Sequence, residues 1–266
     1  MVKKTILDID RCTIRYRDRR DAVSQLSLSV RQGEIVSIVG ESGSGKTTLI
    51  RGILGLLPPG GRITEGHIYF DGKDLAGMPD HALQAIRGKE IAMIFQDVGS
   101  ALDPIRKIRQ QYCESIAVHE RLPRGERLRL AASMLRRVHL SEAERVLASY
   151  PFELSGGMKQ RVGIAMGMTA KPKLLLADEP TSALDVTIQA QVVQQLKELR
   201  DLFGVTIIMV THNMGVASYI SDSIGVMCNS RLVEFGPRDD VIYSPKDAYT
   251  QRLLDAVPKL GGKRNV

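Results

Sequence analysis

The feature that most constrains this chain is the glycine-rich run GESGSGKTT at residues 40–48. It directly follows five residues with the apolar character of a buried strand, Ile35-Val36-Ser37-Ile38-Val39. The residues after it, 48–54, have the apolar spacing of an amphipathic helix. Glycine at such a turn indicates that a group approaches the backbone closely or that the chain adopts positive φ. The run therefore predicts a strand, a tight loop and a helix in direct succession.

The loop fits the pattern G-x-x-x-x-G-K-S/T, in which the lysine is Lys46 and the hydroxyl residue is Thr47. In such a loop successive N–H groups turn inward to bind an anion, and the next helix adds its positive N-terminal end. Lys46 can then reach nucleotide phosphates, and the Thr47 hydroxyl can bind Mg²⁺. The alternative, a glycine-rich turn with a chance lysine, is disfavoured by the flanking strand and helix. The predicted nucleotide-binding residues are Gly40, Glu41, Ser42, Gly43, Ser44, Gly45, Lys46, Thr47 and Thr48.

A second buried-type strand, at 173–178, ends in the acidic pair Asp178 and Glu179. Open α/β sheets bind ligands at the carboxyl ends of their strands, so both carboxylates are expected beside the nucleotide. Asp178 has the hard oxygen atoms that Mg²⁺ prefers, whether bound directly or through water. Glu179 is a candidate to orient and polarise the attacking water, and its alternative role is that of an acid at a helix N-terminus.

The run Leu154-Ser155-Gly156-Gly157-Met158-Lys159-Gln160 predicts a second anion-binding device, with a serine hydroxyl and bare N–H groups at a helix start. Two such devices on separate parts of one chain need not reach the same nucleotide. A head-to-tail dimer resolves this, because each nucleotide is then held by one subunit's phosphate loop and the other subunit's Ser-Gly-Gly.

The chain between residues 97 and 169 changes to helical spacing, with expected helices at 105–120, 125–138 and 141–149. Ser141 and Glu144 fit a capping box for the last of these helices. Strand-type segments return afterwards at 173–178 and 206–211, with a helical pattern at 188–202 between them. That order is a βαβ arrangement with parallel strands.

The predicted fold class is therefore α/β, in one domain that covers residues 1–266. Residues 1–96 and 170–266 form a P-loop NTPase core with an N-terminal antiparallel β part. Residues 97–169 form an inserted α-helical subdomain.

Composition excludes several other classes. The formal net charge is +7, but basic and acidic residues are interspersed, which favours solvated faces over a nucleic-acid surface. Three distant cysteines indicate a reducing compartment and disfavour a zinc or iron–sulfur site. The sequence has neither an apolar stretch of about 18 residues nor the apolar core of a secretory signal. We expect a cytosolic protein.

The motifs, and their order along the chain, resemble those of the ATP-binding cassette (ABC) ATPases. The likeness covers nearly the whole chain. The phosphate loop is similar to Walker A, the 154–160 run to the signature, and 174–179 to Walker B. The remaining matches are Gln96 to the Q-loop, Thr211-His212 to the switch histidine, and Ser182, Ala183, Leu184 and Asp185 to the D-loop.

The resemblance implies roles for these residues in ATP hydrolysis with Mg²⁺. Glu179, His212 and Gln96 would be catalytic, and Thr47, Gln96 and Asp178 would hold Mg²⁺. Tyr16 falls where the family stacks an aromatic ring on adenine, although it could equally be an ordinary strand residue. The signature residues would act on the neighbouring subunit's nucleotide; they are Leu154, Ser155, Gly156, Gly157, Met158 and Gln160.

Three further segments resemble the peptide and nickel importer branch of the family: 95–105, 150–158 and 243–254. Val98 replaces the proline that is usual in the first of them. The sequence also ends soon after Pro258, whereas longer peptide-type relatives continue, so a nickel or metallophore importer is an equal expectation.

This resemblance implies an energy-supplying subunit of a binding-protein-dependent importer, on the cytoplasmic face of a bacterial inner membrane. Its implied partners are a second ABC ATPase (a homologue or itself), two membrane permease subunits and an extracytoplasmic solute-binding protein, with no nucleic acid. The alternative is an accessory ATPase without transport, such as a carbon–phosphorus lyase component. A nucleic-acid- or ribosome-acting cassette protein would show two cassettes or a long coiled insertion, and neither is visible. The sequence does not identify the transported substrate, because the ATPase subunit of an importer does not bind it.

The segment from Gln96 to Ile108 is expected to couple the nucleotide site to the permease. Residues 97–100 carry no strong helix signal and are expected to form a flexible hinge. Ala101, Leu102 and Ile105 would then line a groove for a short permease helix. The alternative is that these three side chains pack the core of their own subdomain.

Overall fold

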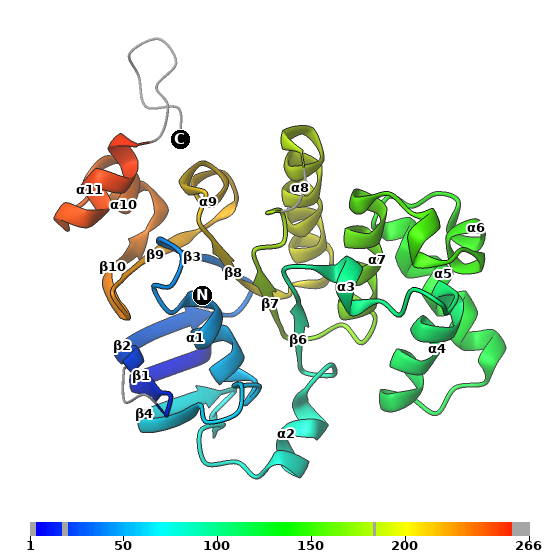
Figure 1. The fold of residues 1–266 in the computed structure, drawn as a ribbon, viewed down its shortest axis with the longest axis horizontal. Coiled ribbons are helices and arrows are strands. Elements are labelled where there is room, and N and C mark those ends of the chain that lie inside the picture. Colours follow the sequence, from blue (N-terminus) through cyan, green and yellow to red (C-terminus); the bar gives the residue numbers. More distant parts are fainter. Residues whose placement is uncertain (1–3, 18–20, 183–184, 257–266) are drawn as a thin grey trace.

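The computed structural model describes residues 4–17, 21–182 and 185–256, which form two β-sheets with flanking helices (Figure 1). The larger sheet has the strand order β10-β9-β3-β8-β7-β6. Its strands pair in parallel except for β10, which pairs antiparallel with β9. Their bounds are β3 (Ile35–Val39), β6 (Ile91–Ile94), β7 (Leu174–Asp178), β8 (Thr206–Thr211), β9 (Ser223–Cys228) and β10 (Arg231–Pro237).

The three central strands are buried along their whole length. Every residue of β3, β7 and β8 is buried, which is typical of parallel strands that are covered on both faces. The predicted strands at 173–178 and 206–211 are therefore confirmed as β7 and β8. Because these strands run in parallel, their carboxyl ends meet at one edge of the sheet.

The smaller sheet has four strands in the order β2-β1-β4-β5, and its pairs are antiparallel. It confirms the expected N-terminal antiparallel part of the fold. Figure 1 shows this sheet below the larger one, with α1 beside it. The bounds are β1 (Thr5–Arg15), β2 (Asp21–Arg31), β4 (Arg62–Phe70) and β5 (Lys73–Asp74).

A group of helices lies at one end of the molecule (Figure 1). Its members share one apolar core, in which Tyr112 is fully buried and its hydroxyl lies 2.8 Å from the Thr169 hydroxyl. The group occupies the stretch where the inserted helical subdomain is expected, and the subdomain boundaries remain a prediction. The helices are α3 (Val98–Ala101), α4 (Ile108–His119), α5 (Arg124–Arg137), α6 (Ala143–Ala148) and α7 (Gly156–Met168).

The remaining helices flank the sheets. A cluster of apolar side chains joins the end of β3 to α9, β9, α10 and α11. Among the described residues, none of the helices combines the length and apolarity needed to cross a membrane. The bounds are α1 (Lys46–Ile53), α2 (Asp80–Ile86), α8 (Val186–Phe203), α9 (Met214–Ile220), α10 (Arg238–Tyr243) and α11 (Ala248–Asp255).

Two local expectations differ from the structure. The capping box of Ser141 and Glu144 does not form, because the helix begins later, at Ala143, and Glu144 pairs with Arg136 instead. The stretch at 97–100, which carries no strong helix signal in the sequence, contributes to the short helix α3, and its role as a hinge stays a prediction. The Asp97 side chain caps α3 by accepting a hydrogen bond from the Ser100 N–H at 3.0 Å.

The predicted groove lining is also wrong in part. Leu102 is only 6% exposed and packs in the core of the helical group, as the alternative reading had it. Ile105 is 82% exposed and Ala101 is exposed, so these two side chains remain available to a partner.

This difference is testable by truncation. Leu102→Ala is expected to lower the free energy of unfolding by about 2–5 kcal/mol, because it leaves a cavity in the core. Ile105→Ala, its matched control, should change that free energy by less than about 0.5 kcal/mol, because its side chain is in water. Urea unfolding followed by circular dichroism measures both. Equal effects of the two substitutions would contradict the placement of Leu102.

Candidate functional site

The phosphate loop is seated against two distant backbone carbonyls. A Cβ on Gly40 would lie 2.1 Å from the carbonyl oxygen of Met227 in β9. A Cβ on Gly45, where φ is 102°, would lie 2.1 Å from the carbonyl oxygen of Ala22 in β2. These glycines are therefore needed because other parts of the chain approach the loop, whatever ligand it binds.

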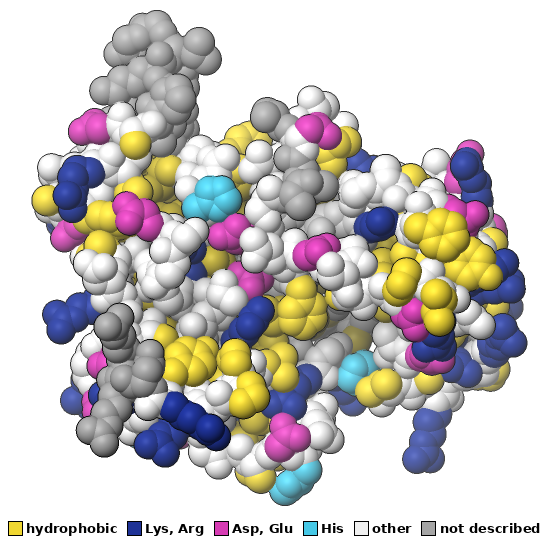
Figure 2. Space-filling view, viewed as in Figure 1, with side chains coloured by type: hydrophobic (Ala, Val, Ile, Leu, Met, Phe, Trp, Pro, Cys, Tyr) yellow, Lys and Arg dark blue, Asp and Glu magenta, His cyan; other side chains and the backbone are white. Residues whose placement is uncertain are grey.

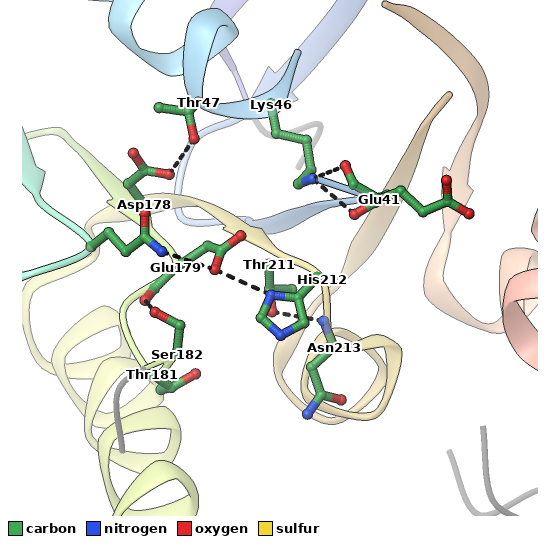
Figure 3. A network of polar contacts seen from close by, with 12 residues as sticks. Glu41, Lys46, Thr47, Asp178, Glu179, Thr181, Ser182, Thr211, His212 and Asn213 are labelled. Atoms are coloured by element: carbon green, nitrogen blue, oxygen red, sulfur yellow. Dashed lines mark hydrogen bonds and ion pairs between the residues drawn. The ribbon is translucent and has the colours of Figure 1, made fainter. Parts of the chain in front are cut away.

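Lys46 is the first residue of α1, and its side chain folds back over the loop (Figure 3). Its Nζ donates to the carbonyl oxygens of Gly40 at 2.8 Å and Glu41 at 2.7 Å, and to the Ser44 hydroxyl at 3.3 Å. The residue is only 5% exposed, and this burial lowers the pKa of Lys46. The nearby carboxylate of Glu179 acts in the opposite direction. The loop thus holds a buried cation in a fixed place.

Thr47 and Asp178 bring two oxygen ligands together from α1 and β7. The Thr47 hydroxyl donates to Asp178 Oδ1 at 2.9 Å (Figure 3). Asp178 is 1% exposed, and burial raises the pKa of its carboxyl group. Within the described ranges no group of three or more His, Cys, Asp or Glu side chains could hold a metal ion. The pair nevertheless suits Mg²⁺, which prefers few protein oxygens and completes its shell with phosphate and water.

The three predicted catalytic side chains meet at the carboxyl ends of β6, β7 and β8. One carboxylate oxygen, Glu179 Oε2, lies 3.1 Å from His212 Nδ1 and 3.4 Å from the side-chain amide of Gln96. Figure 3 shows Glu179 and His212 facing one another across this edge. The structure therefore brings these three side chains together, and their catalytic roles stay a prediction.

One open pocket of about 400 Å³ joins the loop to this carboxylate. Its walls come from the start of β2, from the phosphate loop and α1, and from the ends of β6, β7 and β8. They are formed by Ala22, Ser42, Gly43, Gly45, Lys46, Thr47, Thr48, Gln96, Glu179 and His212.

Glu179 has a backbone conformation that sequence reasoning missed. Its φ is +44°, in the left-handed region, which costs a non-glycine residue about 1–2 kcal/mol. Its N–H donates to the Val210 carbonyl at 2.9 Å, and its carbonyl accepts from the Ser182 N–H at 3.1 Å. Neighbouring strands and turns therefore hold a strained residue in place, as is common at functional sites. No residue pattern signals this, because the strain comes from tertiary contacts.

Tyr16 does not line the pocket of the phosphate loop. It contributes to a separate hollow at the edge of the smaller sheet, and its ring would lie 2.7 Å from a Cβ on Gly61. That hollow is lined by Arg15, Tyr16, Arg17, Gly60, Gly61 and Arg62. Adenine stacking by Tyr16 therefore remains a prediction.

The predicted signature residues lie at the start of α7. Ser155 is exposed and caps this helix, with its hydroxyl accepting from the Met158 N–H at 3.3 Å. A Cβ on Gly157 would lie 2.8 Å from the Ile188 side chain, so this glycine allows α7 to approach α8. Leu154 and Gln160 are buried, and none of the signature residues lines the pocket described above.

The predicted D-loop precedes α8. The Ser182 hydroxyl donates to the Glu179 carbonyl at 3.1 Å. Asp185 caps α8 by accepting from the Ile188 N–H at 3.0 Å. Ala183 and Leu184 lie outside the described residues.

Residues 23–182 match a protein-family model described as "ABC transporter", which covers more than half of the chain. The chain belongs to the ABC transporter family. It is 44% identical over 239 residues to the oligopeptide transport ATP-binding protein OppD of Escherichia coli. That match covers 90% of this chain and 71% of OppD. It is 43% identical over 239 residues to the peptidoglycan transport ATP-binding protein YejF of Agrobacterium fabrum. That match covers 90% of this chain but only 44% of YejF.

Solved structures agree with the sequence relatives. A dimeric post-hydrolysis structure of the ATP-binding cassette MJ0796, bound to ADP and Pi, has a TM-score of 0.78 and 29% identity. The match covers 88% of this chain and 99% of that one. The predicted ABC ATPase fold is thereby confirmed, and the family supports ATP hydrolysis as the activity. The oligopeptide transport name of OppD fits the predicted peptide and nickel importer branch.

The seating of the loop can be tested without any nucleotide. Gly45→Ala and Gly43→Ala both place a side chain at positive φ, but only Gly45 faces a carbonyl oxygen, while nothing lies within 4 Å of Gly43. Overpacking at Gly45 should therefore lower the free energy of unfolding by about 1–3 kcal/mol more than the change at Gly43 does. Urea unfolding of the nucleotide-free protein measures the difference. Equal losses would show that the loop is not confined by Ala22.

Proposed function

We propose that the chain is the ATP-hydrolysing subunit of a binding-protein-dependent importer of peptides. The observation that carries the proposal is the position of Glu179, which lies between Gln96 and His212 on the wall of the pocket that also contains Lys46. Hydrolysis of a terminal phosphate needs a loop that binds the phosphates and a carboxylate in the same pocket that orients the attacking water.

In this proposal the loop N–H groups and Lys46 bind the phosphates of ATP. Thr47 and Asp178, with Gln96 beside them, would hold Mg²⁺, which when bound neutralises phosphate charge. Glu179 accepts a hydrogen bond from the attacking water and orients it. His212, with its ring nitrogen on the same carboxylate, contacts the γ-phosphate and fixes Glu179. Lys46, Glu179 and His212 thus act on a nucleotide and a water bound in the one pocket that they line together.

The proposal includes a dimer. Ser155 and its glycines form an exposed anion-binding helix start that is separate from the pocket of their own chain. A second ABC ATPase, either a homologue or another copy, would supply the same group to this chain's nucleotide. Dimerisation then completes two sites at once.

The proposed partners are two permease subunits and an extracytoplasmic solute-binding protein, with this chain bound at the cytoplasmic face of a bacterial inner membrane. The name of OppD favours peptides, and the transport names of OppD and YejF do not favour an accessory ATPase without transport. Figure 2 shows hydrophobic side chains gathered over α5 and α6, in the helical group. Ile105, between α3 and α4, and Phe152, between α6 and α7, are exposed, and we propose that they contact the permease.

The experiment purifies the tagged chain with the membrane subunits that accompany it and places the complex in vesicles with the solute-binding protein. ATP should drive uptake of a labelled oligopeptide, and Lys46→Ala should abolish uptake without loss of assembly, because the phosphates lose their buried cation. Lys89→Ala, an exposed lysine outside the pocket, serves as the matched control.

Other outcomes are decisive as well. Uptake of a nickel chelate without uptake of peptides would move the chain to the metal branch and overturn the peptide assignment. ATP hydrolysis with no accompanying membrane subunit would overturn the transport proposal. Uptake by the Lys46→Ala complex at the normal rate would remove the loop from the mechanism.

A further inference from the structure

The phosphate loop is hydrogen-bonded to a helix in the C-terminal part of the chain. The hydroxyl of Tyr249, in α11, accepts a hydrogen bond from the Glu41 N–H at 3.2 Å. The carbonyl of the same residue, Glu41, accepts from Lys46 Nζ at 2.7 Å. The backbone of Glu41 is therefore held on one side by α11 and bound on the other by the buried lysine.

The start of α11 is itself fixed by two carboxylates. Glu234 of β10 accepts from the N–H groups of Lys246 at 2.8 Å and Asp247 at 3.2 Å. Asp247 then caps α11, and its side chain accepts from the Tyr249 N–H at 2.8 Å. The position of the Tyr249 ring is thus set from the sheet through these hydrogen bonds.

Apolar packing holds α11 along the same line. Leu254 is fully buried in a cluster with Val39, the residue that ends β3 just before the phosphate loop. Tyr249 is half-buried against that cluster, and the Arg252 guanidinium lies over its ring. Burial raises the pKa of Tyr249, so the hydroxyl stays protonated at neutral pH.

Tyr249 is outside the pocket. Neither Tyr249 nor Glu41 is among the residues that line it, whereas Ser42, Gly43 and the residues from Gly45 to Thr48 are. The hydroxyl therefore acts on a bound nucleotide through Glu41, the loop residue that it contacts.

We propose that Tyr249 is a positioning residue for the phosphate loop. Its hydroxyl fixes the backbone of Glu41, and with it the carbonyl oxygens that orient Lys46, so that a displacement of α11 lowers nucleotide affinity. The inference rests on the proposed binding of phosphates by residues 40–48 and is independent of the transport proposal.

The expected effect is on binding rather than on the chemical step. Without the hydroxyl, the Glu41 N–H turns to water and the loop has more conformations to lose when a nucleotide orders it. The loss of one net hydrogen bond should weaken ATP and ADP affinity about two- to tenfold. The turnover number at saturating ATP should not change, because Tyr249 makes no contact with Glu179, Gln96 or His212.

The test measures dissociation constants for a fluorescent ATP analogue on the full chain, well below its melting temperature. Tyr249→Phe keeps the ring and removes only the hydroxyl. Tyr243→Phe is the matched control, because Tyr243 is an exposed tyrosine of the neighbouring helix α10. Glu234→Ala is a second route to the same effect, since it releases the start of α11 and leaves Tyr249 unchanged.

The two routes should not add. If Glu234 acts through Tyr249, the double variant should bind about as weakly as the weaker single variant. Normal affinity of Tyr249→Phe would overturn the proposal, as would full additivity of the two changes. If Tyr249→Phe does not fold, Glu234→Ala decides: weakened binding at an unchanged turnover number supports the proposal, and normal binding overturns it.

Lys46→Ala distinguishes a failure of the positioning role of Tyr249 from a failure of phosphate binding by residues 40–48. Loss of affinity in Lys46→Ala together with normal affinity in Tyr249→Phe would overturn only the positioning role. Normal affinity in Lys46→Ala would show instead that residues 40–48 do not bind the phosphates.

Discussion

Parallel pairing of β3, β8, β7 and β6 is the constraint on which the rest of the site depends. The register sets Val39 beside Thr211, Asp178 beside Val210, and Ile94 beside Ala177. Four strands consequently end at one edge, where a phosphate loop, two acids, an amide and an imidazole come within reach of one another. This register is costly to shift, because a slip by one residue would disrupt the close packing of side chains on both covered faces.

Much of this site could be predicted from the sequence, because its groups follow directly from strand ends. The run before Gly40 and the run before Glu179 each combine a buried strand with polar residues, and parallel strands bring such ends together. That rule predicts that Glu179 and His212 lie near one another, and the structure adds the contacts of Thr47 with Asp178 and of Glu179 with His212. The spacing of a motif is enough to predict which side chains lie together where the sheet fixes the position of the strand ends.

The rest depended on contacts between distant segments, which local patterns do not encode. An apolar residue such as Leu102 has the same periodicity whether it packs its own core or faces a partner. Gly45 is required by the carbonyl of Ala22, and the strain of Glu179 by β8 and the following turn. The contact from Tyr249 to the loop was missed because the two groups are 208 residues apart in the sequence.

In the proposed dimer, the groups of one chain form an incomplete site, which a second subunit closes around ATP. Glu179→Gln tests it most directly, because it keeps the shape of the side chain but removes the charge that orients water. Light scattering should show a dimer with ATP and Mg²⁺ but a monomer with ADP, either with this chain alone or with the ATPase subunit that accompanies it. A variant that binds ATP and stays monomeric in both mixtures would contradict the composite dimer site, and normal hydrolysis by that variant would contradict the role of Glu179.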